Sequence, residues 1–293
     1  MLKISIVTPC YNMAAYIEQT IRSILSQGYD NLEYIIIDGG STDGTTDIIE
    51  RYRDSLAYYV SEPDKGMYDA INKGFAHATG DVIAWLNADD IYLPGALQTV
   101  NKVFTTFEDV EWINARNTYM SQDGSITQVL AKNAFRTRED IRNGWCRDEL
   151  LGFLMQEGMF WRRSLMDRAG GLDTRYKYAG DYDLWMRFAQ ITDIHYVNVP
   201  LSAYRRRNDC LSTTQLDGYL AEVKAIHAGK PTYPGFLWRL FSRENRRMLN
   251  LLRLLRFRRA NIIYYTFIGD NLTRKKTIGN SSTHTLSSLL TLG

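Results

Sequence analysis

Residues 32–44 read LEYIIIDGGSTDG, in which a β-branched apolar run ends at an acid and is followed by turn residues. Such a run is typical of a buried strand that ends in a loop. Similar runs occur at 3–9 (KISIVTP), 57–60 (AYYV) and 81–86 (DVIAWL). Apolar residues at helical spacing lie between them, at 13–27, around 48–49 and at 66–78. Strands that alternate with helices in this way predict an α/β fold, with a doubly wound, mostly parallel central sheet of the Rossmann-like kind.

The pattern changes after residue 95. We expect a helix at 95–107, strands near 110–119 and 126–130 around a hairpin-like turn at 122–124, and a helix at 181–190. We interpret this second half as part of the same domain as the first.

The charge of the chain is balanced overall but unevenly placed. Its 293 residues include 35 Lys and Arg against 33 Asp and Glu, a formal net charge of +2, which by itself argues against nucleic acid as a partner. Residues 236–259 hold eight arginines and one glutamate, so this segment carries +7 and the remainder −5. The three cysteines show no CxxC spacing, and we find no signal peptide or long apolar span. We therefore expect a cytoplasmic protein.

Acidic side chains stand where two predicted strands end, at Asp38 and at Asp89 with Asp90. The ends of parallel strands line one crevice, so these carboxylates can converge. There they can accept hydrogen bonds from a base or a ribose, or hold Mg²⁺ or Mn²⁺. Taken singly, each is equally well explained as a turn or helix-cap residue. The chain has no P-loop and no GxGxxG after its first strand, which argues against those ways of holding phosphate.

Several motifs, in this order, resemble the family 2 glycosyltransferases of the GT-A fold. They are SIVTPCYN (5–12), IDGGSTDG (37–44), EPDKG (62–66), NKG (72–74) and LNADD (86–90) in the first half, and QE (156–157), FWRR (160–163) and GDYDLW (180–185) in the second. The resemblance implies an inverting enzyme of the kind that builds bacterial surface polysaccharides.

The resemblance also implies roles for individual residues around a nucleotide-diphosphate sugar. The metal ligand, for Mn²⁺ or Mg²⁺, is Asp89, in the place of the family's Asp-x-Asp. Asn87 stands where that motif usually has its first acid, and Gly39 replaces the second acid of a common Asp-Asp pair. The positions matching the nucleotide-sugar site are Thr8, Pro9, Tyr11, Asp38, Asp64, Asn87 and Ala88.

Asp181 matches the general base of inverting transfer, which must take the proton of the attacking hydroxyl. Asp173 and Asp183 lie nearby, and spacing alone does not choose among the three. The usual preceding Glu is Gly180 here, which leaves Glu157 as an alternative base or acceptor-orienting group. Further expected contacts with acceptor, donor sugar or diphosphate are Gln156, Glu157, Trp161, Trp185 and Arg205. Core packing explains the two tryptophans at least as well, and a solvated run of charges explains the arginine at least as well.

We expect residues 1–210 to form the glycosyltransferase domain, with a nucleotide-sugar half (1–95) and an acceptor half (96–210). Residues 211–278 are expected to form a helical, basic and amphipathic extension, followed by a disordered tail at 279–293. The arginines of 236–259 favour either an anionic membrane surface or packing on the core. We therefore expect a peripheral protein on the inner face of the plasma membrane.

The predicted activity is transfer from a nucleotide-diphosphate sugar, with a UDP-sugar favoured, to a saccharide or lipid-linked acceptor. Two other functions remain open. One is a nucleotidyltransferase that makes an activated sugar, which would favour a Gly-rich basic loop after the first strand. The other is a non-catalytic, membrane-bound protein that binds a sugar nucleotide.

Overall fold

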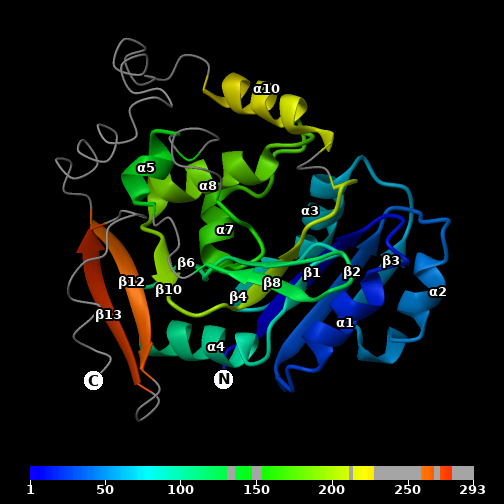
Figure 1. The fold of residues 1–293 in the computed structure, drawn as a ribbon, viewed down its shortest axis with the longest axis horizontal. Helices are drawn as coiled ribbons and strands as arrows, with labels where there is room; N and C mark the ends of the chain where they lie inside the picture. The colour runs from blue at the N-terminus through cyan, green and yellow to red at the C-terminus, as the bar shows by residue number, and fades with distance from the viewer. Residues whose placement is uncertain are drawn as a thin grey trace.

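The first half of the chain forms the parallel part of a large sheet (Figure 1). The computed structural model describes residues 1–130, 136–144, 146, 154–210, 214–227, 259–266 and 271–278. Four strands lie in the order β4-β1-β2-β3 and pair in parallel: β1 (Ile4–Cys10), β2 (Leu32–Asp38), β3 (Tyr58–Ser61) and β4 (Val82–Trp85). The connections contain α1 (Ile17–Leu25), α2 (Thr45–Glu50), η1 (Arg53–Ser55) and α3 (Met67–His77). The predicted alternation of strands and helices is confirmed.

The sheet continues beyond β4 with strands from the second half. β9 (Met159–Arg162) lies antiparallel between β4 and β6 (Trp112–Asn114), and β10 (His195–Val197) pairs in parallel with β6. The full order is β13-β12-β10-β6-β9-β4-β1-β2-β3. Helices of this half are α4 (Ala96–Thr106), α5 (Arg138–Arg142), α7 (Arg163–Ala169) and α8 (Gly180–Ile191). Five of the eight strand pairings are parallel, which confirms a mostly parallel sheet.

A second, smaller sheet carries the loops that face the carboxyl ends of β1 and β4. Its order is β5-β11-β7-β8, from β5 (Ile91–Tyr92), β7 (Thr118–Met120), β8 (Ile126–Val129) and β11 (Ser202–Arg205). The hairpin expected around 122–124 joins β7 to β8, and Gly124 takes a φ of +91° in it, a conformation that favours glycine.

The expected helical extension at 211–278 is wrong over part of its length. The described residues there form the helix α10 (Leu216–Ile226) and, further on, the strands β12 (Arg259–Thr266) and β13 (Asn271–Ile278). β12 pairs in parallel with β10, so Ile262 and Ile263 are buried in the main sheet. Such β-branched residues favour a strand. The basic segment up to residue 258 and the tail at 279–293 lie outside the described residues. Within the described part, no helix is long and apolar enough to cross a membrane.

Four tryptophans pack together where α8 meets the middle strands of the main sheet, namely Trp85 of β4, Trp112 of β6, Trp161 of β9 and Trp185 of α8. Trp85 and Trp185 stack with their ring centroids 5.5 Å apart, and Trp161 meets both edge-on. Trp161 and Trp185 are 0% and 1% exposed. The prediction that they contact a sugar is therefore wrong, because neither ring has a face left for a ligand. Core packing, the alternative left open by the sequence, is what the structure shows.

Candidate active site

The loops that follow β1, β2 and β3 meet beside one exposed aromatic ring. Tyr11 is 59% exposed at the end of β1. A Cβ on Gly39 would lie 2.7 Å from Asp64 Oδ2 and 3.4 Å from Tyr11 Cδ2, so these three residues are in contact. Gly39 thus has a steric reason to be glycine, since the Asp64 carboxylate fills the space of a side chain there. Of the predicted nucleotide contacts, Tyr11 and Asp64 are the ones brought together.

Thr8 and Pro9 lie inside β1 and are buried, which contradicts their predicted contact with the base. The Thr8 hydroxyl instead accepts a hydrogen bond from the Tyr34 hydroxyl at 3.2 Å.

Asp38 organises the turn after β2. Its buried carboxylate accepts hydrogen bonds from the backbone N–H groups of Gly40 and Ser41, at 3.1 and 2.9 Å, and from the hydroxyls of Ser41 and Ser61. Four donors therefore occupy the two carboxylate oxygens. The turn role that the sequence left open is the one this structure shows, and a contact between Asp38 and a base stays a prediction.

Asp89 is the only acid in the tripeptide Asn87-Ala88-Asp89, and its carboxylate faces an arginine. Its Oδ2 lies 3.1 Å from Arg207 Nε, and both side chains are nearly enclosed. Burial raises the pKa of Asp89, while the charge of Arg207 opposes that rise. The neighbouring Asp90 is fully buried and accepts the backbone N–H of Arg205, and burial raises its pKa well above the usual range. The sequence of three consecutive arginines, 205–207, does not indicate which of them pairs with Asp89.

Asn87 and Ala88 share this loop. Ala88 is buried, and the Asn87 amide lies 3.4 Å from both Asp90 Oδ2 and Gln156 Oε1. The Asn87 Oδ1 atom has no hydrogen-bond partner among the described residues. Gln156 is itself held to the end of β4, since its Nε2 donates to the Trp85 carbonyl at 2.6 Å.

Arg205 is not a diphosphate contact in this structure, contrary to prediction. It is 1% exposed, and its guanidinium donates to the carbonyls of Asp89 and Gln122, at 2.6 and 2.8 Å, and to the Gln19 side chain. These bonds tie the Asp89 loop to the β7–β8 turn and to α1. Arg205 therefore holds the loop in place and leaves Arg207 as the cation beside the carboxylate.

The described residues offer little to a metal ion by themselves. No group of three or more His, Cys, Asp or Glu side chains among them could hold one. Divalent ions that bind phosphates often take only one or two protein carboxylates and complete their shell with phosphate oxygens and water. Asp89 fits that sparse arrangement, as one carboxylate shared with a bound diphosphate.

Asp181 stands apart from the other two acids of its segment. Asp173 is bound by Arg175 at 2.6 Å, and Asp183 by Arg187 at 2.8 Å. Asp181, in the first turn of α8, has no such arginine among the described residues, and its Oδ1 lies 3.1 Å from the Tyr68 hydroxyl. Protein atoms surround its carboxyl group closely, and this desolvation raises its pKa to about 6. A carboxylate of this kind is suited to accept a proton near neutral pH.

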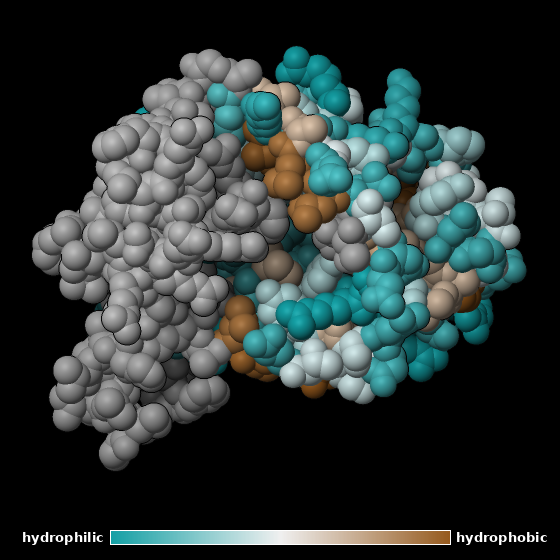
Figure 2. Space-filling model, turned by 45° about the horizontal axis from the view of Figure 1, so that its top comes forward, coloured by the Kyte–Doolittle hydropathy of each residue, from teal (hydrophilic) through white to brown (hydrophobic). Residues whose placement is uncertain are grey.

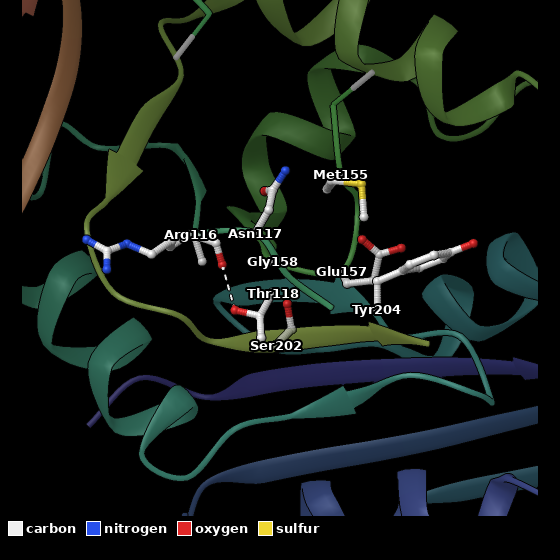
Figure 3. Close-up of a pocket in the computed structure, with 9 residues that line it drawn as sticks. Arg116, Asn117, Thr118, Met155, Glu157, Gly158, Ser202 and Tyr204 are labelled. Atoms are coloured by element: carbon white, nitrogen blue, oxygen red, sulfur yellow. Dashed lines mark hydrogen bonds between the residues drawn. The ribbon is translucent and has the colours of Figure 1, made fainter. Parts of the chain in front are cut away.

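Glu157 interacts electrostatically with both Asp89 and Asp181 and lines a small pocket (Figure 3). It is 7% exposed, and its Oε2 has no hydrogen-bond partner among the described residues. Burial raises its pKa to about 7, with the charges of Asp89 and Asp181 adding to the rise. The pocket is lined by Ala115, Arg116, Asn117, Thr118, Met155, Glu157, Gly158, Ser202 and Tyr204. The space-filling view shows a hollow near the middle of the molecule, with hydrophilic side chains beside it (Figure 2).

Comparison with known proteins now identifies the family. The sequence profile of Glycosyl transferase family 2 matches residues 5–164, more than half of the chain. The chain belongs to this family. The matched segment covers nearly all of β1, then β2 to β4, residues 87–89 and β9, and it ends before Asp181.

Related family 2 sequences are known from several bacteria. An uncharacterized glycosyltransferase of Nostoc sp. is 30% identical over 182 residues, which cover 59% of this chain and 54% of that protein. Another, of Rickettsia typhi, is 26% identical over 247 residues, which cover 82% of this chain and 73% of that protein. The chain thus spans about half the length of the Nostoc relative.

Solved structures share the fold of this family 2 chain. S. aureus TarS 1–349 in complex with UDP-GlcNAc aligns with a TM-score of 0.61 at 17% identity, over 85% of this chain and 75% of that one. The mannosyltransferase PcManGT from Pyrobaculum calidifontis, in complex with GDP-Man and Mn²⁺, aligns with a TM-score of 0.58 at 21% identity, over 80% and 66%. These likenesses confirm the predicted GT-A type of α/β fold.

Proposed function

We propose that this chain is an inverting glycosyltransferase that moves a sugar from a nucleotide-diphosphate sugar to a hydroxyl of a saccharide or lipid-linked acceptor. The observation that carries the proposal is Asp181, a carboxylate bonded by the Tyr68 hydroxyl and by no arginine of the described part of the chain, whose pKa of about 6 suits a general base. A UDP-sugar is the favoured donor, on the resemblance at Tyr11 and Asp38. TarS binds UDP-GlcNAc and PcManGT binds GDP-Man, so both nucleotides occur on this fold.

The residues divide the work between the two ends of the site. The exposed Tyr11 ring, with Asp64 beside it, offers a flat surface for the base. The acceptor oxygen forms a bond to the anomeric carbon from the face opposite the diphosphate, the bond from that carbon to the diphosphate breaks, and the hydroxyl proton passes to the Asp181 carboxylate. Glu157, half protonated near neutral pH, can donate to or accept from a sugar hydroxyl.

Positive charge must meet the leaving diphosphate. A divalent ion, Mn²⁺ or Mg²⁺, held jointly by Asp89 and the diphosphate would neutralise charge there. Arg207, 3.1 Å from Asp89 Oδ2, is the protein's own cation at this position. It holds the carboxylate in place and adds to the positive charge that the diphosphate meets.

The setting of the reaction also stays a proposal. Surface-polysaccharide synthesis rests on the resemblance alone, whereas a cytoplasmic location and the docking of 236–259 on an anionic membrane rest on the sequence pattern. Because Arg259 begins β12, a test of the membrane contact should replace arginines between 239 and 258 and leave that strand intact.

The test begins with a thermal-shift screen of UDP-, GDP- and dTDP-sugars with Mn²⁺, and continues with Asp181→Asn. We expect one nucleotide class to raise the melting temperature in both proteins, and nucleotide release to be lost only in Asp181→Asn. Turnover by Asp181→Asn at the wild-type rate would refute its role as base. A wild type that binds a sugar nucleotide but never releases nucleotide, even to water, would favour the non-catalytic alternative.

A further inference from the structure

A carboxylate from α10 holds the loop that leads into Asp181. Glu222 Oε1 accepts the backbone N–H of Lys177 at 2.8 Å, and Oε2 accepts those of Tyr178 and Ala179, each at 2.8 Å. Three consecutive amides thus converge on one side chain that lies more than forty residues later in the chain. Bonds of this kind, from neutral donors to an ionised acceptor, are among the stronger ones in proteins.

The loop has no comparable anchor of its own. Ala179 is the N-cap residue of α8 and supplies no side-chain cap, and Asp181 follows two residues later. Gly180 cannot supply one either, because a Cβ there would lie 2.8 Å from the Tyr68 ring. The amides of Tyr178, which is half-buried, and of Ala179, which is buried, therefore depend on an acceptor from elsewhere, since N–H groups kept from water and left without a partner cost free energy.

A separate apolar cluster packs α10 against this loop and α8 (Figure 1). Val223 and Ile226 of α10 are buried against residues of the loop and of α8, namely Ala179, Tyr182 and Met186. Glu222 adjoins this cluster in the sequence, so packing fixes where its carboxylate lies. The cluster falls beyond residue 164, outside the segment that the family profile covers.

We propose that Glu222 is the positioning residue of the general base, fixing the backbone of 177–179 so that Asp181 faces the acceptor. The proposal rests on the proposed function, in which Asp181 takes the proton. Misplacing a catalytic group by about 1 Å costs on the order of 100-fold in rate, so an anchor one turn away has a measurable kinetic effect.

The charge of Glu222 also reaches Asp181, together with the other groups around it. Tyr68 of α3 hydrogen-bonds the Asp181 carboxylate, Tyr219 of α10 and Glu157 interact with it electrostatically, and Glu222 adds negative charge. Removing that charge lowers the pKa of Asp181, so the acid side of the activity profile should move to lower pH.

The experiment compares Glu222→Gln and Glu222→Asp with Asp217→Asn, which removes an exposed acid from the same helix. The readouts are UDP release from UDP-GlcNAc to water, UDP affinity, the pH profile and hydrogen exchange of the 177–179 amides. We expect UDP release to fall about 10- to 100-fold in both Glu222 variants while UDP affinity stays within about twofold. Glu222→Gln should also shift the acid limb down, whereas Glu222→Asp, which keeps the charge, should not.

Hydrogen exchange needs no turnover, so it tests the anchor even if another donor is used. Faster exchange at 177–179 in folded Glu222→Gln, with Asp217→Asn unchanged, supports the anchor. Wild-type exchange, or turnover within twofold of wild type in both Glu222 variants, would overturn the proposal. So would a loss of turnover matched by an equal loss of UDP affinity. An active Asp181→Asn refutes the base assignment instead, whatever Glu222 does.

Discussion

The raised pKa of Asp181 makes a quantitative prediction for the pH dependence of transfer. Burial raises this pKa to about 6 from the usual 3.8. The carboxylate must be ionised to accept a proton, so a group of pKa about 6 is about 90% active at pH 7 and about 10% active at pH 5. Activity should therefore fall about tenfold between these values. A base with the usual pKa would lose less than about a tenth of its activity over the same range.

Tyr68→Phe tests the structural cause of this pKa. The Tyr68 hydroxyl lies 3.1 Å from Asp181 Oδ1 and stabilises the ionised form, while it also lies 2.9 Å from the Tyr178 carbonyl. A hydrogen bond to a charged group contributes about 1.5–3 kcal/mol, and 1.36 kcal/mol corresponds to one pKa unit. Since the hydroxyl proton is shared between two acceptors, we expect a rise of about one unit. At pH 6 the ionised fraction then falls from about one half to about one tenth, a fivefold loss of rate.

The assay is nucleotide release under kcat/KM conditions from pH 4.5 to 8, with circular dichroism recorded over the same range. Tyr29→Phe is the matched control, because it removes a tyrosine hydroxyl that donates to the Leu2 carbonyl and has no bond to Asp181. It should leave the pH midpoint unchanged. A wild-type midpoint near 4, or an unshifted midpoint in Tyr68→Phe, would refute the reasoning. A midpoint near 7 that Tyr68→Phe leaves alone, with activity lost in Glu157→Gln, would assign the proton to Glu157.

Three further predictions concern stability and the cation site. Although burial opposes it, hydrogen bonds from Lys3, Ser5 and Thr79 lower the pKa of Glu33 to about 2 from 4.5; Glu33→Gln should therefore lose about 3 kcal/mol at pH 7, an effect that fades as pH falls from 4.5 towards 2, measured by urea unfolding. Trp185→Phe should lower the free energy of unfolding by about 1–3 kcal/mol without changing donor affinity. If the folded variant bound the donor tenfold more weakly, Trp185 would contact the sugar after all. Arg207→Gln should bind Mn²⁺ more tightly in the absence of donor, by about fivefold for each 1 kcal/mol with which the enclosed guanidinium holds Asp89; unchanged Mn²⁺ affinity in calorimetry would show that Arg207 does not compete.

The sequence predicts the first half of this fold well because local signals there agree. β1, β2 and β4 are apolar runs buried on both faces, and each ends at a polar loop. The later strands carry weaker signals. β6 and β10 have three residues each, and the described side chains of β13 are largely exposed at the edge of the sheet. Their identity as strands depends on neighbours that come from distant parts of the chain, which no local pattern records.

The site shows the same division between local and distant information. Spacing among Asp173, Asp181 and Asp183 did not choose one of them, although a local signal was present, because Arg175 and Arg187 follow Asp173 and Asp183 by two and four residues and pair with them. Resemblance selected Asp181, and the arginine pairings give a physical reason for that choice. Glu222 could not be found from sequence, since its three partners lie more than forty residues away.

The three consecutive arginines at 205–207 have different surroundings, because the chain is extended here. Alternate residues of an extended chain point to opposite sides. Arg205 and Arg207 accordingly both lie against the Tyr16 ring, 5.1 and 4.8 Å from its centroid, whereas Arg206 lies over Tyr119 at 4.0 Å.

Arg206 is exposed, and Arg205 is fully engaged by the loops that it joins. Only Arg207 faces a carboxylate that a diphosphate or a metal ion would also approach. Of the three arginines in this run, one therefore supplies positive charge at the proposed cation site. A metal ion that reaches Asp89 has to compete with that one group, whereas the diphosphate of a donor would be attracted to it, which makes Arg207 the residue that couples donor binding to the state of Asp89.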